Sequence, residues 1–231
     1  MGKEPEVNGA FDMGKVQILT DKQEAILAGL GREEWFTGRF YFTGGTALSE
    51  VYLQHRVSED LDLFTEKEFE TQKVLEITGT LAREKKFTIN PRWSEPVMIY
   101  ILKYADGEVL KVDFAKYPYA RLEESQKKIV GITVDSLLDI AVNKLLSMTQ
   151  RMEVKDFVDM YFLLKRFSFW DLVRGVEVKF KVEVDPFLFA VDVLGVESFD
   201  HMPKMLRPLS LDKLKKFYRD LSVKLGKRVV E

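Results

Sequence analysis

Two stretches of the sequence decide the fold: Phe42-Thr43-Gly44-Gly45-Thr46-Ala47-Leu48, and after it Ser58-Glu59-Asp60-Leu61-Asp62-Leu63-Phe64. The first stretch ends the apolar run 40–42, which predicts a strand stopped by a glycine turn. A helix over about 46–54 is predicted next. The second stretch alternates apolar and acidic residues, as a half-buried strand does. This region therefore predicts the order strand, glycine turn, helix, acidic strand.

The rest of the first half extends this pattern into a mixed sheet with flanking helices. The Asp106-Gly107 pair is a hairpin signal between two apolar runs. The predicted elements are helices over 21–36 and 69–86, and strands over 97–104 and 108–116.

After Gly131 the pattern changes to helices. Thr133 or Asp135 is the predicted cap of a helix that runs to about Arg151. The later predicted helices cover 155–166 and 211–225, the last of them amphipathic. The fold class is therefore α+β, and the predicted domains are a sheet domain over 1–130 and a helical subdomain over 131–231.

Composition limits the kind of site that this chain can build. The 231 residues are 46% hydrophobic, which is enough for a sizeable core, and they include no cysteine and two histidines. A disulfide framework and a thiolate metal site are excluded, and a zinc site is not expected. Any bound metal is therefore expected to be a hard ion held by oxygen, Mg²⁺ or Mn²⁺.

Charge and hydropathy indicate a globular protein without a membrane partner. No apolar window approaches the length of a membrane span, and Met1–Glu6 lacks the layout of a signal peptide, so the cytoplasm is the expected compartment. The 35 basic and 37 acidic side chains give a net charge of -2. This balance neither indicates nor excludes a nucleic-acid partner.

Strand parity predicts that carboxylates gather on one face of the sheet. Side chains alternate along a strand, so Asp60 and Asp62 share one face. Asp113, between two apolar residues of strand 108–116, points away from the core in the same manner. If the two strands are neighbours, three carboxylates converge, and a divalent cation or a shared proton must relieve their repulsion.

The glycine turn adds a second element of the predicted site. Gly44, Gly45 and Thr46 lie between a strand and a helix N-terminus, where backbone amides attract an anion. An acidic pair or a glycine turn alone is more often structural. Together they form the layout that phosphoryl or nucleotidyl transfer requires, with amides on a triphosphate and metal ions on the carboxylates.

These two stretches resemble the signature of the AbiEii/AbiGii toxin family, a branch of the polymerase-beta-like nucleotidyltransferases. The resemblance implies the polymerase-beta-like mixed sheet and assigns the metal-binding pair to Asp60 and Asp62, with Asp113 as the third acid. It also implies a toxin of a toxin–antitoxin or phage-defence system, paired with a cognate antitoxin and modifying RNA, with tRNA as a candidate. The resembling segments cover roughly 40–165.

The helix after Gly131 carries a lysine inside its apolar stripe. Lys144 falls on the same arc as Ile140 and Ala141. Two interpretations are open: the side chain reaches solvent at the edge of the stripe, or its ammonium reaches a nucleotide phosphate. The family resemblance favours the second interpretation.

The next helix is apolar almost all round and still carries two aspartates. Asp156 can be a helix-start residue, whereas a buried Asp159 needs a counter-ion, for which Lys144 or Arg151 is the candidate. By the resemblance, Lys144 and Asp159 belong to the catalytic residues and Asp156 to the nucleotide-binding residues, in a pattern that also includes Asp139.

Three polar residues precede the acidic strand. Arg56 is either a triphosphate ligand or a surface loop charge, and Ser58 is a cap or a phosphate contact. His55 is expected to be structural, because nucleotidyl transfer depends on metal ions and positioning more than on a histidine base. The aromatic side chains at the following positions are expected in the core: Trp35, Trp93, Phe167, Phe169 and Trp170.

The sequence hypothesis is a transferase that binds a nucleoside triphosphate with Mg²⁺ or Mn²⁺, aligns an acceptor hydroxyl with the α-phosphate and releases pyrophosphate. Asp113 would help to activate the acceptor. Two alternatives remain open: a metal-dependent phosphohydrolase that uses the same carboxylates, and a non-catalytic module whose helical half binds a protein partner.

Overall fold

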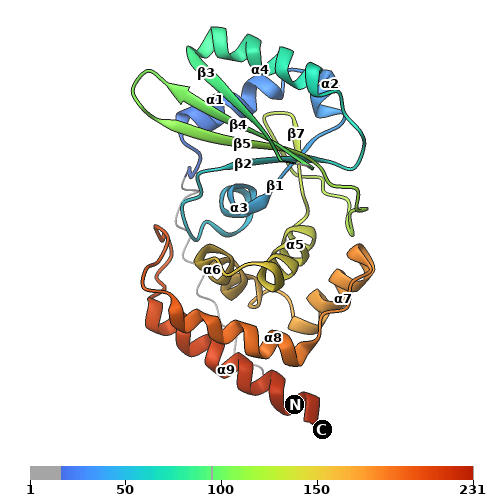
Figure 1. Cartoon of the computed structure of the whole chain (residues 1–231), viewed down its shortest axis with the longest axis vertical. Coiled ribbons are helices and arrows are strands. Elements are labelled where there is room, and N and C mark those ends of the chain that lie inside the picture. The colour runs from blue at the N-terminus through green and yellow to red at the C-terminus, as the bar shows by residue number, and fades with distance from the viewer. Residues whose placement is uncertain (1–16, 95, 231) are drawn as a thin grey trace, which may run out of the picture.

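The computed structural model describes residues 17–94 and 96–230. The N-terminal residues that bear on the signal-peptide prediction lie outside this range. The sheet and the helices on its outer face form one half of the molecule, and helices α5 to α9 form the other (Figure 1). Within the described part of the chain, none of the helices combines the length and the apolar character needed to cross a bilayer.

A mixed sheet organises the first half. Its strand order is β3-β4-β5-β2-β1-β7-β6. The strands are β1 (Tyr41–Thr43), β2 (Leu61–Thr65), β3 (Phe87–Ser94), β4 (Val97–Tyr104), β5 (Val109–Lys116), β6 (Lys128–Ile129) and β7 (Ile132–Val134). Strand β2 is parallel to β5 and antiparallel to β1, so the α+β prediction is confirmed.

Alternation along the strands divides the sheet into a core face and a cleft face. Leu61 and Leu63 of β2 are fully buried, and Val112 and Phe114 of β5 are at most 1% exposed. Helices α1 (Asp21–Leu30), α2 (Glu34–Thr37) and α4 (Thr71–Lys85) lie on the core side (Figure 1). The intervening residues of β2 and β5, including both aspartates, therefore face the other half.

The glycine turn passes directly into helical structure beneath the sheet. Strand β1 continues into α3 (Gly44–Ala47) and then into η1, a π-helix over Leu48–Leu53. Gln54 closes it in the left-handed conformation with φ of 48°. The predicted helix over 46–54 is therefore present, but it starts at the glycines and widens after its first turn.

Five α-helices of the described residues and a 3₁₀ segment form the second half. They are α5 (Leu137–Gln150), α6 (Val154–Leu163), α7 (Phe169–Phe180), α8 (Pro186–Asp192), η2 (Val193–Ser198) and α9 (Leu211–Val230). Ser136 caps α5 by accepting from the backbone N–H of Asp139, so the predicted caps Thr133 and Asp135 are wrong. Thr133 belongs to β7, and the Asp135 carboxylate accepts from Thr43 instead.

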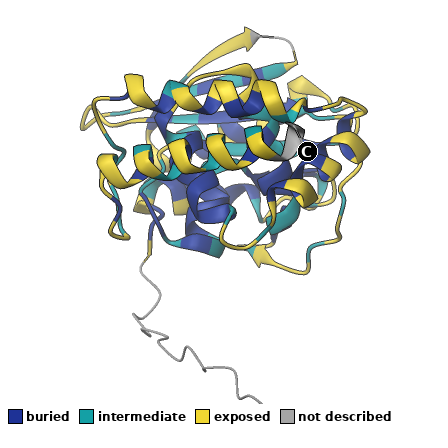
Figure 2. Cartoon of the chain, turned by 90° about the horizontal axis from the view of Figure 1, so that it is seen from below, coloured by how far each residue is buried: buried dark blue, intermediate teal, exposed yellow. Residues whose placement is uncertain are grey.

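Some predicted elements and burials differ from the structure. The predicted helix over 21–36 is two helices, because α1 ends at Gly31. Trp93 and Trp170 are 56% and 38% exposed, so their prediction as core residues is wrong. Phe169 is buried, as predicted, and the outer faces of the helices in Figure 2 are exposed while their inner faces are buried.

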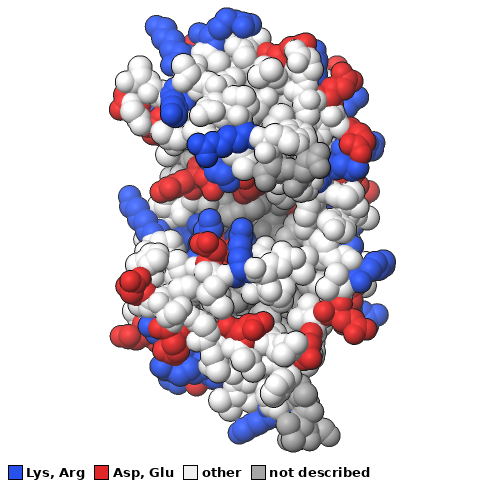
Figure 3. Space-filling model, viewed as in Figure 1, with Lys and Arg blue, Asp and Glu red and all other residues white. Residues whose placement is uncertain are grey.

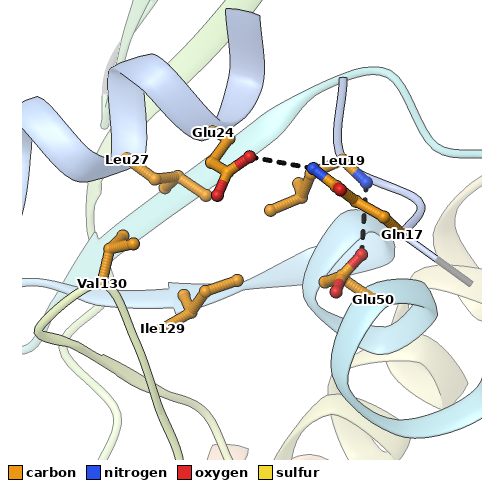
Figure 4. A pocket seen from close by; sticks show the side chains of 7 residues that line it. All are labelled: Gln17, Leu19, Glu24, Leu27, Glu50, Ile129 and Val130. Atoms are coloured by element: carbon orange, nitrogen blue, oxygen red, sulfur yellow. Dashed lines mark hydrogen bonds between the residues drawn. The ribbon is translucent and has the colours of Figure 1, made fainter. Parts of the chain in front are cut away.

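A small pocket of about 290 Å³ lies between α1, η1 and β6 (Figure 4). Its polar groups already have partners: Glu50 accepts from the backbone N–H groups of Ile18 and Leu19, and Gln17 donates to Glu24. None of the predicted site residues lines this pocket. Its carboxylates therefore hold the segment that enters α1.

Candidate active site

A larger cleft of about 450 Å³ separates the sheet from α5. Figure 3 shows the surface hollowed between the two halves, with acidic and basic side chains gathered at its borders. Predicted site residues supply much of its lining: Gly44, Gly45, Arg56, Ser58, Asp60, Asp62, Asp113 and Lys144. Residues as far apart in the sequence as Gly44 and Lys144, 100 positions, thus meet in one cavity.

The parallel pairing of β2 with β5 brings the acidic residues together. Asp62 and Asp113 are direct partners in the register, and side-by-side residues of neighbouring strands project to the same face. Asp60 lies one residue before β2, on the same side as Asp62, and also lines the cleft. The structure therefore meets the condition on which the predicted convergence depended, namely that the two strands are neighbours.

Burial, with the neighbouring carboxylates as a second cause, raises the pKa values of Asp62 and Asp113. Burial, together with the charge of Asp113, raises the pKa of Asp62 to about 6. Burial also raises the pKa of Asp113, and its Oδ1 atom is buried without a hydrogen-bond partner among the described residues. Both groups thus lack the positive charge that would fully stabilise their ionised forms.

Lys111 is the cation nearest to this group. It lies two residues before Asp113 on β5 and therefore on the same face. Its Nζ atom is 2.5 Å from Asp113 Oδ2 and 3.9 Å from Asp60 Oδ2. A single ammonium thus bridges two of the three carboxylates, and Asp62 remains without a direct ion pair in the described structure.

The donor set fits a hard divalent cation, although the side chains are not grouped around one position. Among the described residues, no three acidic or histidine side chains are arranged so that they could hold a metal ion. The unpartnered Asp113 oxygen and the raised pKa of Asp62 nevertheless mark two adjacent oxygen donors that need positive charge. Asp60, whose side chain is 39% exposed, is turned toward Lys111.

The two glycines are required by the close approach of charged side chains to the turn. Gly44 has φ of +75°, and a Cβ atom there would lie 1.9 Å from Asp62 Oδ2. A Cβ atom on Gly45 would lie 2.7 Å from Arg56 Nη2 and 3.0 Å from Ser58 Oγ. The turn therefore lets an acid and a cation reach the same strip of backbone.

Thr46 does not line the cleft, in contrast to its predicted role as a phosphate ligand. Its side chain is fully buried, and its hydroxyl donates to the backbone carbonyl of Asp60. Thr46 therefore holds the start of the acidic strand in place. Ser58 lines the cleft, and its contact with a phosphate stays a prediction.

Lys144 lies at the cleft, held by two aspartates of α6. Its Nζ atom is 2.7 Å from Asp156 Oδ1 and 2.7 Å from Asp159 Oδ2, and the residue is 7% exposed. The interpretation that this lysine reaches solvent at the edge of the helix is therefore wrong. Its ammonium lies close enough to Asp62 to lower the pKa of that carboxyl, although burial outweighs this effect.

Arg56 is buried rather than a surface loop charge. Its Nε and Nη2 atoms donate to the two oxygens of Asp159 at 2.6 and 2.9 Å, a bidentate pair across 103 residues of sequence. Burial alone would raise the pKa of Asp159, but Lys144 and Arg56 hold it well below its usual value. The two cations at the floor of the cleft are thus fixed by one ionised carboxylate.

The two aspartates of α6 lie behind the cations instead of in the cleft. Both are fully buried, and neither lines the cavity. Asp156 also accepts from Arg151 Nε at 2.7 Å, so the alternative in which Arg151 neutralises Asp159 is wrong. The predicted nucleotide contact of Asp156 and catalytic contact of Asp159 are thereby replaced by contacts that position Lys144 and Arg56.

His55 supports the same carboxylate. Its Nε2 atom is 2.7 Å from Asp159 Oδ1, and burial lowers the pKa of the imidazole. A fully buried ring beside Phe162 cannot reach the cleft, in agreement with the structural role expected from the sequence. Asp139, by contrast, belongs to a separate buried ion pair with Lys179, with Nζ and Oδ1 2.6 Å apart.

Two cleft cations were not identified from the sequence. Lys111 could have been found by the parity argument, because it shares a strand face with Asp113. Lys155 lines the cleft from α6, and its charge acts on Asp113. The sequence gives no comparable signal for Lys155, since its position depends on how α6 packs under the sheet.

Comparison with known proteins agrees with this geometry. Residues 26–220 match the family model described as nucleotidyl transferase AbiEii toxin, Type IV TA system. The chain belongs to the AbiEii nucleotidyltransferase toxin family. This membership confirms the resemblance seen in the two stretches around the glycine turn and the acidic strand.

Individual relatives of this AbiEii family member are more distant. An uncharacterised protein, aq_aa25, from Aquifex aeolicus is 37% identical over 139 residues, which span 58% of this chain and 61% of the relative. MenT4, a nucleotidyltransferase toxin from Mycobacterium tuberculosis, superposes with a TM-score of 0.58 at 21% identity and covers 89% of this chain and 82% of its own. JHP933 from Helicobacter pylori gives a TM-score of 0.52 at 21% identity, with 89% and 90% covered. These structures share the fold.

Proposed function

We propose that this AbiEii family member transfers a nucleoside monophosphate from a nucleoside triphosphate to an acceptor hydroxyl and releases pyrophosphate. The observation that carries the proposal is the register pair Asp62–Asp113, which lies beside the glycine turn and across the cleft from Lys144. Negative charge for metal ions and positive charge for phosphates thus face each other in one cavity. Family membership supports the same reaction.

The proposed substrate position follows from the charges that line the cleft. In the proposed complex the triphosphate lies in the cleft against the turn Gly44–Gly45, with Arg56 and Ser58 beside Gly45 and Lys144 on the helical side. Buried Asp159 fixes the direction of both cations, so little freedom is lost when the phosphates bind. Asp156 contributes in the same way through Lys144.

We propose Mg²⁺ or Mn²⁺ as the cofactor, held by Asp60, Asp62 and Asp113. When bound, the ion supplies Lewis-acid stabilisation of the charge that develops on the phosphoryl oxygens. Asp113, whose buried Oδ1 has no partner in the described structure, is in position to accept the proton of an incoming hydroxyl or to bind the ion. Lys111 is paired with Oδ2 of Asp113, so Oδ1 is the oxygen left for either role, and the ammonium charge opposes a bound cation.

In the proposed domain division, the sheet domain, residues 1–130, contributes the acids, and the helical subdomain, residues 131–231, contributes Lys144. Cation and acid thus come from opposite sides of the cleft. The biological proposal is a toxin of a toxin–antitoxin system, with a cognate antitoxin and an RNA acceptor, of which tRNA is a candidate. The family description supports the toxin and the antitoxin.

The test is to incubate the native chain with α-³²P-labelled nucleoside triphosphates, Mg²⁺ and total RNA. Label fixed in RNA is the expected result, together with pyrophosphate release. Free nucleoside monophosphate or diphosphate without labelled RNA would instead indicate a phosphohydrolase. Asp62→Asn is expected to abolish transfer, whereas Glu59→Gln, an exposed neighbour outside the cleft, is expected to leave it unchanged.

A further inference from the structure

The cleft face of the sheet extends beyond the acid pair across two more strands. Asp113 of β5 is registered with Ile99 of β4, and Ile99 with Arg92 of β3. One row of side chains therefore leads from the acid pair to the edge of the sheet. Since neighbouring strands lie about 4.8 Å apart, the Cα atoms of Asp113 and Arg92 are about 10 Å apart.

Burial shows that this outer part of the face is open. Along β4 the even-numbered residues Met98, Tyr100 and Leu102 are buried toward α4, whereas Ile99 and Ile101 are half-buried. Along β3 the residues that share the cleft face are exposed: Thr88, Asn90 and Arg92. No helix of the described structure covers the sheet here, in contrast to the core side (Figure 1).

The open face carries two cations for which the described structure gives no ion pair, Arg92 and Lys103, beside Lys111, which is paired with Asp113 and Asp60. It carries Arg92, Lys103 and Lys111, around a floor formed by Ile99 and Ile101. Among the described residues of β3, β4 and β5 whose side chains face the cleft, Asp113 is the acidic one. The nearby hairpin acids Asp106 and Glu108 share the single ammonium of Lys22 of α1, which leaves one net negative charge at the hairpin end of the face.

The helical side of the cleft also carries basic side chains near Asp113. Lys155 acts on Asp113 from α6, and Arg151 lines the cavity beside it. An anionic chain leaving the acid pair toward β3 would therefore meet positive charge on both sides. Phosphate groups are the matching partners of such clusters.

We propose that the open face of β3, β4 and β5, with Arg92 and Lys103 as its phosphate contacts, holds the acceptor of the reaction as a single-stranded nucleic-acid end. The proposal rests on the proposed function, because an acceptor hydroxyl must reach Asp113. A phosphate backbone fits the row of cations, and bases fit the apolar floor, which favours a nucleic acid over an acidic peptide. The face measures about 10 by 14 Å, from two strand spacings and four residues of β4.

The test measures binding of a fluorescein-labelled single-stranded decaribonucleotide of mixed sequence by anisotropy, without nucleoside triphosphate. The variant is Arg92→Glu with Lys103→Glu. Its matched control is Arg83→Glu with Lys85→Glu, two exposed cations of α4 on the opposite side of the sheet. Thermal melting of each variant confirms folding, and calorimetry with Mn²⁺ and a non-hydrolysable triphosphate reports the nucleotide site separately.

The face variant is expected to bind the oligonucleotide at least tenfold more weakly than the control. The slope of the logarithm of the binding constant against the logarithm of salt concentration should become shallower by about 0.7 per lost phosphate contact, or about 1.4 for two contacts. Nucleotide binding should be unchanged. If the face variant and the control bind the oligonucleotide equally, the proposal is overturned, as it is if poly-glutamate competes as well as unlabelled RNA.

Failure of the proposed function gives a different pattern. Oligonucleotide binding that depends on Arg92 and Lys103, without any transfer of label from nucleoside triphosphate, would leave the nucleic-acid surface in place and contradict the transferase. Transfer that proceeds equally well in the face variant and the control, at subsaturating RNA, would contradict the surface and leave the transferase in place.

Discussion

Removing the charge of Asp62 is expected to stabilise the metal-free protein. The pKa of this carboxyl is about 6 in the folded chain against 3.8 for the ordinary side chain. A difference of about 2 units corresponds to roughly 3 kcal/mol at about 1.4 kcal/mol per unit. Because the residue borders the open cleft, screening by water reduces this value. Asp62→Asn should therefore raise the free energy of unfolding by about 1–3 kcal/mol at pH 7.5.

The pH dependence of this gain has a definite sign. A raised pKa means that between about pH 4 and pH 6 the folded protein binds the proton more readily than the unfolded chain. Native stability from this group therefore falls as the pH rises through that window. Asn resembles the protonated carboxyl, so the difference between the variant and the native chain should be near zero at pH 4, grow to pH 6 and stay constant above it.

The assay is urea unfolding in EDTA at half-unit steps from pH 4 to 8. The difference between the two proteins is the quantity to compare, because Asp135 also has a pKa of about 6 and contributes equally to both. Glu59→Gln removes a neighbouring exposed carboxylate and is the matched control. A variant less stable than the native chain at pH 7.5, or a gain that is as large at pH 4, would refute the reasoning.

Three further variants probe the glycine turn, the buried carboxylate of Asp159 and the ammonium of Lys111 beside the acids. Gly44→Ala should cost about 2 kcal/mol or more, because of its positive φ and the contact with Asp62, whereas Gly79→Ala on α4, with open space for Cβ, should stabilise by up to about 1 kcal/mol in the same urea titration. Asp159→Ala should cost about 3–5 kcal/mol, because it leaves the buried Arg56 without its carboxylate and removes one of the two carboxylates that hold Lys144; a loss below 1 kcal/mol in urea unfolding would contradict this. Lys111→Met should raise Mn²⁺ affinity roughly tenfold in low-salt calorimetry, and an unchanged or weaker affinity would show that the lysine does not oppose the ion.

Local patterns in the sequence predicted the elements that carry the acids. Alternation along β2 and β5 places leucine, valine and phenylalanine inward, so the outward direction of Asp62 and Asp113 follows from the period of a strand. Their adjacency does not follow, because it depends on a parallel pairing between strands about 50 residues apart. The prediction was therefore conditional until the strand order was known.

Other features depend on packing that no local pattern records. Strand β3 contains Pro91 and exposed polar residues, and it is formed because the hairpin with β4 gives it a partner on one side. Arg56 and Asp159 are 103 positions apart, and no local sequence pattern predicts that they pair. The short strands β6 and β7 were missed because two or three residues carry no measurable period.

The segment that joins η1 to β2 is held by backbone contacts with residues 204–207. The backbone N–H of Val57 donates to Lys204, those of Leu206 and Arg207 donate to the carbonyl of His55, and Arg56 forms a β-bridge with Met205. During synthesis the N-terminal sheet emerges first, but these backbone partners leave the ribosome only some 150 residues later. A nascent chain would therefore carry its paired acids about 150 residues before the backbone on either side of Arg56 gains these partners.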